Sequence, residues 1–131
     1  MSEYKYNCIM LIDDSEIDNM VNAHILSKNN IAKNIIVHSS ANDALNYLSK
    51  IAADENMAVP DVILLDINMP IMNGFGFLVE FEKFDESLIN NIKVIMLTSS
   101  VDPNDIRRSK EYKTVQAFIS KPLSLEHLST I

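Results

Sequence analysis

The sequence predicts an α/β fold: a doubly wound, five-stranded parallel sheet of the flavodoxin-like (βα)5 kind. Short, almost continuously apolar runs alternate with longer amphipathic segments, which is typical of βα units and a parallel sheet. A chain of 131 residues has room for about five such units. We therefore expect one domain over residues 1–131, with no linker and no output domain.

The predicted strands are rich in Ile, Val and Leu, as expected of strands that helices cover on both faces. They are Cys8–Ile12, Ile35–His38, Val62–Leu65, Val94–Leu97 and Val115–Ile119. Right-handed crossovers place helices on both faces of such a sheet, and ligands bind outside the carboxyl ends of its strands. The residues that follow the strands are therefore the first candidates for a functional site.

Helices are predicted between the strands. Apolar residues recur on one face of the first helix, at Ile17, Met20, Val21 and Ile25, and we expect Met20 to fill the core. The other helices are marked by caps or apolar spacing: Ser40, then Phe77, Leu78 and Phe81, then Asp102-Pro103, and finally Ser124 between Leu123 and Leu128. The segment Asp85–Asn91 is interpreted as a loop extension, and Asp18, Glu80 and Glu82 as solvated helix positions.

Composition excludes several classes of function. The net charge of −7 and pI near 4.8 argue against nucleic-acid binding, because such a surface repels phosphate backbones. The two glycines, Gly74 and Gly76, are too few for a P-loop or a dinucleotide-binding turn. No apolar run is long enough to span a bilayer, and no secretory signal is evident. The single Cys8 fits a reducing cytoplasm and is interpreted as a buried, inert thiol.

Polar residues suited to one chemistry follow four of the five strands. The Asp13-Asp14 pair follows the first strand, Asp66 the third and Thr98 the fourth, and Lys121 comes just after the fifth. Each is common alone as a turn or solvated residue, but together they suit magnesium-assisted phosphoryl transfer to a carboxylate. Mg²⁺ prefers oxygen ligands, and a cation with a lysine keeps a crowded carboxylate ionised as a nucleophile.

The run Asp66–Gly74, with the sequence DINMPIMNG, resembles the loop of response-regulator receiver domains, which carries aspartate-x-x-Met-Pro-x-Met-Asp/Asn-Gly. The acidic pair, Thr98 and Lys121-Pro122 fall at the family's other signature positions, in its order and spacing. The resemblance covers essentially the whole chain. It implies a two-component signalling protein whose aspartate accepts a phosphoryl group, and a phosphoacceptor switch rather than an enzyme.

The same resemblance assigns roles by position. It implies that Asp66 is the phosphoacceptor, with a histidine kinase or a histidine-containing phosphotransfer protein as donor. Mg²⁺ would be bound by Asp14, Asp66 and the backbone carbonyl of Asn68, with Asp13 acting through water. Lys121 would contact phosphoryl oxygens, and its bond to Pro122 is expected to be cis.

The switch itself is also implied by the resemblance. Thr98 would move toward the phosphoryl group, and Phe118 would swing inward behind it. An unknown downstream protein would then bind the face formed by the fourth helix, fifth strand and fifth helix. This chain departs from the family in having Phe118 where tyrosine is common and Thr114 where glycine is common, while Asn68 and Ser100 resemble positions that tune dephosphorylation.

Two other functions remain open at this stage. A small Mg²⁺-dependent phosphohydrolase of the haloacid-dehalogenase type also forms an aspartyl phosphate, but needs a second aspartate two residues after the nucleophile, where this chain has Asn68. A pseudo-receiver, an interaction module that is never phosphorylated, usually lacks an acidic-pair or lysine position. Because this chain has all of them, the pseudo-receiver is the alternative to a phosphorylated switch.

Overall fold

The computed structural model describes residues 3–99 and 102–130. Its five-stranded sheet is entirely parallel, with the strand order β2-β1-β3-β4-β5. The strands are β1 (Tyr6–Ile12), β2 (Ala32–His38), β3 (Val62–Leu65), β4 (Lys93–Thr98) and β5 (Val115–Ser120). The predicted doubly wound α/β fold is confirmed, and each predicted strand is present.

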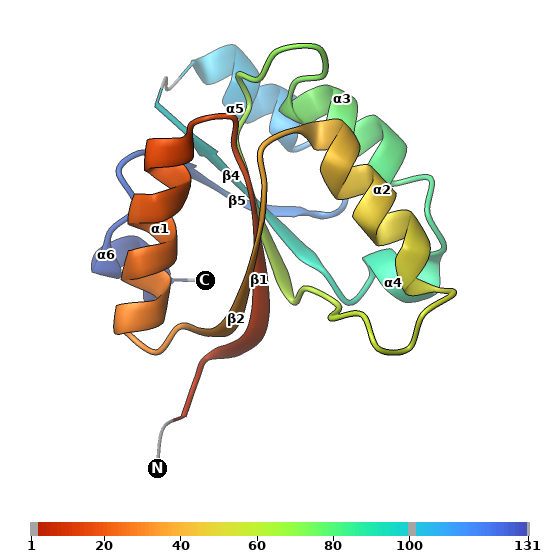
Figure 1. Cartoon of the computed structure of the whole chain (residues 1–131). Coiled ribbons are helices and arrows are strands. Elements are labelled where there is room, and N and C mark those ends of the chain that lie inside the picture. The colour runs from red at the N-terminus through yellow and green to blue at the C-terminus, as the bar shows by residue number, and fades with distance from the viewer. Residues whose placement is uncertain (1–2, 100–101, 131) are drawn as a thin grey trace.

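Helices cover both faces of this sheet, as Figure 1 shows. One face carries α1 (Glu16–Lys28) and α6 (Leu125–Leu128); the other carries α2 (Ala41–Ile51), α3 (Gly74–Phe81), α4 (Glu86–Ile89) and α5 (Pro103–Ser109). The apolar side chains accordingly form two cores. The core on the α2 and α3 side is larger and contains Phe75, Phe77 and Phe81, whereas the core under α1 and α6 is aliphatic.

The predicted helix caps are confirmed. Ser40 Oγ accepts a hydrogen bond from the backbone N–H of Asp43 at 3.1 Å, and Ser124 Oγ accepts one from the N–H of His127 at 3.3 Å. Asp102 caps α5, with proline in its first turn. Because a cap satisfies N–H groups that have no partner within the helix, these short polar signals define where each helix begins.

The prediction for the buried face of α1 is wrong. Ile17 and Met20 are 73% and 70% exposed, while the residues buried against the sheet are Asn19, Asn22 and Leu26. The reason is a polar anchor: the Asn19 side-chain amide donates a hydrogen bond of 2.8 Å to the Asp13 carbonyl. This bond turns a polar face of the helix toward the strand end, so Ile17, Met20 and Val21 are exposed. Ile25 of the predicted face is partly buried and packs against the aliphatic core.

The interpretation of Asp85–Asn91 as a loop is also wrong. The segment forms the short helix α4, in which Asp85 Oδ1 accepts a hydrogen bond from the N–H of Ser87 at 3.0 Å. Ile89 is 1% exposed and packs into the larger core. Tertiary burial of one isoleucine thus stabilises a helical turn that its polar composition does not predict.

The strand order places β1 beside β3 at the centre of the sheet. From β1 the chain crosses to β2 on one side, and from β2 it returns to β3 on the other, so the direction of winding reverses between β1 and β3. In open parallel sheets the crevice outside the carboxyl ends of the strands at this reversal is where ligands bind. The residues that follow β1 and β3 are Asp13 and Asp66.

Candidate functional site

Asp66 lies at the carboxyl end of β3 and its side chain is only 7% exposed. Its backbone N–H donates a hydrogen bond of 2.9 Å to the Ile12 carbonyl, which ties the residue to the end of β1. All four residues of β3 are buried apolar side chains. A rigid, two-sided apolar strand therefore holds this carboxylate at the edge of the sheet.

The acidic pair after β1 meets Asp66. Asp13, Asp14 and Asp66 each offer a carboxylate oxygen, and these oxygens all lie within 4.8 Å of one another. Asp13 is buried and its Oδ1 accepts a hydrogen bond of 2.9 Å from the Ser15 N–H, while Asp14 is exposed at the mouth of the cluster. Three oxygen donors with one open side suit a hard divalent cation such as Mg²⁺.

Lys121 brings a positive charge to this cluster from β5. Its ammonium Nζ lies 2.7 Å from Asp13 Oδ2 and 3.6 Å from Asp66 Oδ1. Its backbone N–H donates a 2.7 Å hydrogen bond to the Thr98 carbonyl, which fixes it to the end of β4. The Lys121-Pro122 peptide bond is cis, as predicted.

The electrostatics of the site oppose ionisation of Asp66. Burial and the neighbouring carboxylate of Asp13 raise the pKa of Asp66 from its ordinary value of 3.8 to about 6, although Lys121 acts in the opposite direction. For Lys121, burial lowers the pKa, but hydrogen bonds to Asp13 and Asp18 outweigh burial and raise it. The lysine therefore stays protonated, and Asp66 is a carboxylate whose charge is destabilised until a further cation arrives.

Thr98 and Phe118, the predicted switch residues, lie on the neighbouring strands β4 and β5. Thr98 ends β4, the strand next to β3, and is fully buried. Phe118 lies on β5 directly beside Met96 of β4 and packs, partly buried, against the larger core. Together with Ile106 and Ser109 of α5, it borders a small hollow. A side chain with free space on one side can change rotamer without disrupting the core.

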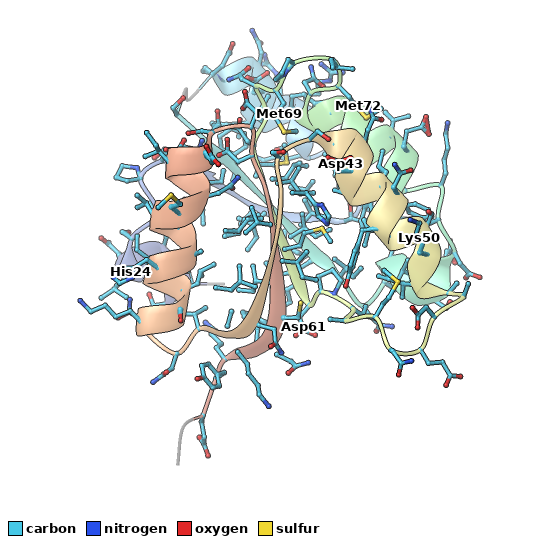
Figure 2. The ribbon with its side chains drawn as sticks, viewed as in Figure 1. His24, Asp43, Lys50, Asp61, Met69 and Met72 are labelled. Carbon is cyan, nitrogen blue, oxygen red and sulfur yellow. The ribbon has the colours of Figure 1, made fainter. Side chains whose placement is uncertain are left out.

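The loop after Asp66 is buried at Ile67, Met69 and Gly74, whereas its tip is exposed, with Ile71 98% exposed. Figure 2 shows Met69 and Met72 of this loop beyond the carboxyl ends of the strands, and Asp61 at the opposite end of the molecule. A Cβ atom at Gly74 would lie 2.6 Å from the Asp66 carbonyl oxygen, so only glycine fits without backbone movement. Asn68 is exposed beside the cluster, and Ser100 lies outside the described residues.

Sequence reasoning missed Asp18. Its carboxylate Oδ2 lies 2.8 Å from Lys121 Nζ, nearly as close as Asp13 Oδ2 at 2.7 Å. Its interpretation as a solvated helix position is therefore wrong. The signal that could have found it is spacing, since a residue in the first turn after Asp13-Asp14 stays near the strand end.

The interpretation of Glu82 as a solvated helix position is also wrong. Its Oε2 accepts hydrogen bonds from both the N–H and the hydroxyl of Thr114.

Comparison with known proteins identifies the class. A family model described as the response regulator receiver domain matches residues 9–131. The chain therefore belongs to the response regulator receiver family, a family of two-component signalling domains that interact with histidine kinases and phosphotransfer proteins and bind Mg²⁺ at an acidic pocket. The family resemblance predicted from the sequence is confirmed.

Particular relatives agree with this assignment. A two-component response regulator from Cytophaga hutchinsonii has a TM-score of 0.86 and 31% identity, over 95% of this chain and 92% of that one. The response regulator Rcp1 of Synechocystis sp. is 28% identical over 92% of this chain and 80% of its own length. The Mn²⁺-bound form of Rcp1 has a TM-score of 0.75 and 26% identity, over 95% of this chain and 88% of that one.

Two further observations bear on the sequence predictions. In the described part of the chain, no helix has the length and apolarity that crossing a membrane requires. Cys8 is fully buried, and burial raises the pKa of its thiol, which favours the protonated and less reactive form. The prediction of an inert thiol is therefore supported.

Proposed function

We propose that this chain is a phosphoacceptor switch in which Asp66 receives a phosphoryl group from a histidine kinase or a histidine-containing phosphotransfer protein. The observation that supports this most strongly is the gathering of the buried Asp66 carboxylate, the acidic pair and the Lys121 ammonium at one end of the sheet. The raised pKa of Asp66 fits the role, because a divalent cation would neutralise the neighbouring carboxylates and leave Asp66 ionised as a nucleophile.

The donor set of the acidic cluster fits Mg²⁺. Asp14, Asp66 and the backbone carbonyl of Asn68 would bind it directly, and Asp13 would act through water. The ion would supply neutralisation of phosphoryl oxygens when bound. The Mn²⁺-bound form of Rcp1 supports a divalent cation here by analogy.

The chain's own residues account for the transfer. A carboxylate oxygen of Asp66 attacks phosphorus as the P–N bond of a phosphohistidine breaks, so an acyl phosphate forms and the imidazole leaves with the bonding electrons. Lys121 Nζ, already 3.6 Å from Asp66, pairs with a phosphoryl oxygen. The Thr98 hydroxyl stabilises another. Such transfer requires mainly positioning and charge neutralisation, which these residues provide.

The switch follows from the new contacts. Movement of Thr98 toward the phosphoryl group leaves space into which Phe118 turns. A few kcal/mol of differential interaction inverts a two-state equilibrium of this kind. The face that changes is formed by α5, β5 and α6, the fourth helix, fifth strand and fifth helix of the family pattern, and we assign the downstream partner to it. We place the protein in the cytoplasm, with no nucleic-acid partner for this acidic domain.

Labelling with acetyl phosphate and Mg²⁺ tests the proposal. We expect stoichiometric incorporation of phosphate that is stable to acid and labile to base, and that Asp66→Asn abolishes. Asp61→Asn is the matched control, because it changes the same residue type at the other end of β3, and it should be labelled like the wild type. Equal labelling of Asp66→Asn would refute Asp66 as the acceptor, and no labelling of the wild type would favour the pseudo-receiver. Steady phosphate release from many substrates would favour a hydrolase.

A further inference from the structure

Lys121 has two carboxylate partners at nearly equal distance, and only one of them belongs to the acidic cluster of Asp13, Asp14 and Asp66. Its Nζ is 2.7 Å from Asp13 Oδ2 and 2.8 Å from Asp18 Oδ2, but 3.6 Å from Asp66 Oδ1. Asp13 belongs to the group of carboxylates that can hold a cation, and Asp18 does not. The lysine therefore contacts one carboxylate of this group and one carboxylate of α1 outside it, and both are nearer to its Nζ than Asp66 is.

The position of Asp18 is built into the start of α1. Its backbone N–H donates a 3.2 Å hydrogen bond to the Ser15 hydroxyl, the cap of the helix. The next residue, Asn19, donates its side-chain amide to the Asp13 carbonyl at 2.8 Å. These bonds fix the first turn against the end of β1, so Asp18 faces the site rather than solvent alone.

A bound divalent cation would change the balance between the two partners. The cation and the ammonium repel each other, and the cation would take up the charge of Asp13. Asp18 would then be the carboxylate that remains available to Lys121 in the direction away from Asp66. A phosphoryl group on Asp66 would then have to compete with Asp18 for the Lys121 ammonium.

We propose that Asp18 is a positioning residue for Lys121: it holds the ammonium in a withdrawn position and competes with the phosphoryl group for it. The proposal rests on the proposed phosphoacceptor function. Asp18 is 41% exposed on its side chain, against 6% for Asp13, so solvent weakens the pair. Asp18 thereby adjusts the stability of the phosphorylated state without preventing its formation.

Binding of beryllium trifluoride, a phosphoryl mimic, in saturating Mg²⁺ tests this proposal by calorimetry. Asp18→Asn should tighten binding by about two- to five-fold, the range for a partly exposed ion pair. Glu16→Gln is the matched control, since it removes an exposed carboxylate from the same helical turn, and Glu16 joins no ion pair among the described residues. Asp18→Glu should restore wild-type affinity. In a Lys121→Met background, Asp18→Asn should lose its effect.

A second readout does not depend on phosphoryl binding. In metal-free protein, the Lys121 ammonium resonance should shift and exchange faster with water in Asp18→Asn but not in Glu16→Gln. An unchanged resonance, or an affinity change that persists in the Lys121→Met background, would overturn the proposal. Failure of the wild type to bind beryllium trifluoride, with the resonance responding as expected, would instead count against the phosphoacceptor function.

Discussion

The two ends of β3 each carry an aspartate, and the two side chains have opposite surroundings. Asp61, at the amino end, accepts hydrogen bonds on Oδ2 from the N–H groups of Asn7 at 3.0 Å and Cys8 at 3.1 Å. Asp66, at the carboxyl end, shares its space with two other carboxylates and meets a lysine at 3.6 Å. In Figure 2, Asp61 and Met69 of the loop after Asp66 lie at opposite ends of the molecule.

This difference separates a carboxylate held by backbone hydrogen bonds from one crowded by other carboxylates. Two backbone N–H groups of the β1 strand donate hydrogen bonds to the Asp61 carboxylate, so the residue joins the start of β3 to β1. Like charges and burial destabilise the negative charge of Asp66. Because the negative charge of Asp66 is destabilised, its neutralisation by a bound cation would be favourable. Cation binding at the carboxyl end of β3 would therefore stabilise the folded protein.

The largest expected effect tests how rigidly the carboxyl end is supported. Gly74→Ala should lower the free energy of unfolding by about 3 kcal/mol, because its Cβ would meet the backbone oxygen of Asp66 at 2.6 Å. Urea denaturation measures this. Gly76→Ala is the control, since the one close contact of its Cβ would be with the flexible Met72 side chain, at 2.8 Å, and not with backbone. Similar stability losses in the two variants would show that the loop can yield, contrary to the tight packing described.

The next prediction is a substitution that should raise the free energy of unfolding, whereas most substitutions lower it. Because the pKa of Asp66 is raised from 3.8 to about 6, the folded state binds the proton more tightly than the unfolded state does, and wild-type stability falls as pH rises through this range. In metal-free buffer at pH 7, Asp66→Asn should therefore be more stable than the wild type by roughly 1–3 kcal/mol. Denaturation at pH 4 and pH 7 measures the difference.

The control for this result is built into the same experiment. The advantage of Asp66→Asn should shrink at pH 4, where the wild-type carboxyl is protonated in the folded state, and Mg²⁺ should stabilise the wild type more than the variant. A variant that is less stable than the wild type at both pH values would contradict the electrostatic description of the site.

The smallest effect concerns the amino end. Asp61→Ala should lower the free energy of unfolding by about 1 kcal/mol, because two backbone N–H groups lose their acceptor. Asp61→Asn keeps a side-chain oxygen and should lose less. Thermal unfolding measures both variants. If Asp61→Ala were stabilising, as Asp66→Asn should be, the two ends of β3 would not differ in the way proposed.

Much of the fold could be predicted because its signals are local. The bounds of β3, Val62–Leu65, match the prediction, since a run of four apolar residues between aspartates has few alternatives. Capping residues such as Ser40 also work locally, through a hydrogen bond three residues along the chain. The face of α1 could not be predicted in this way. Its orientation depends on the bond from Asn19 to the end of another element, and that bond overrides the apolar stripe.

In the candidate site, too, some features could be predicted from the sequence and others could not. The residue types at the strand ends, from Asp13 to Lys121, were evident from the chain, because a parallel sheet brings the carboxyl ends of its strands to one edge. The partner of the lysine was not evident. Asp18 and Lys121 are 103 positions apart. The spacing of Asp18 after Asp13-Asp14 places it near the strand end, but only the fold shows that the lysine contacts it.

Sequence by itself determined the order of the elements, the alternation that requires a parallel sheet, and which functional groups reach its edge. Only the tertiary structure decided which charges touch and how deeply they are buried, and hence that the charge of Asp66 is destabilised while Asp61 accepts backbone hydrogen bonds. The physical reason is range: hydrophobic period and capping act over a few residues, whereas the energy of a charge depends on every group that folding places around it.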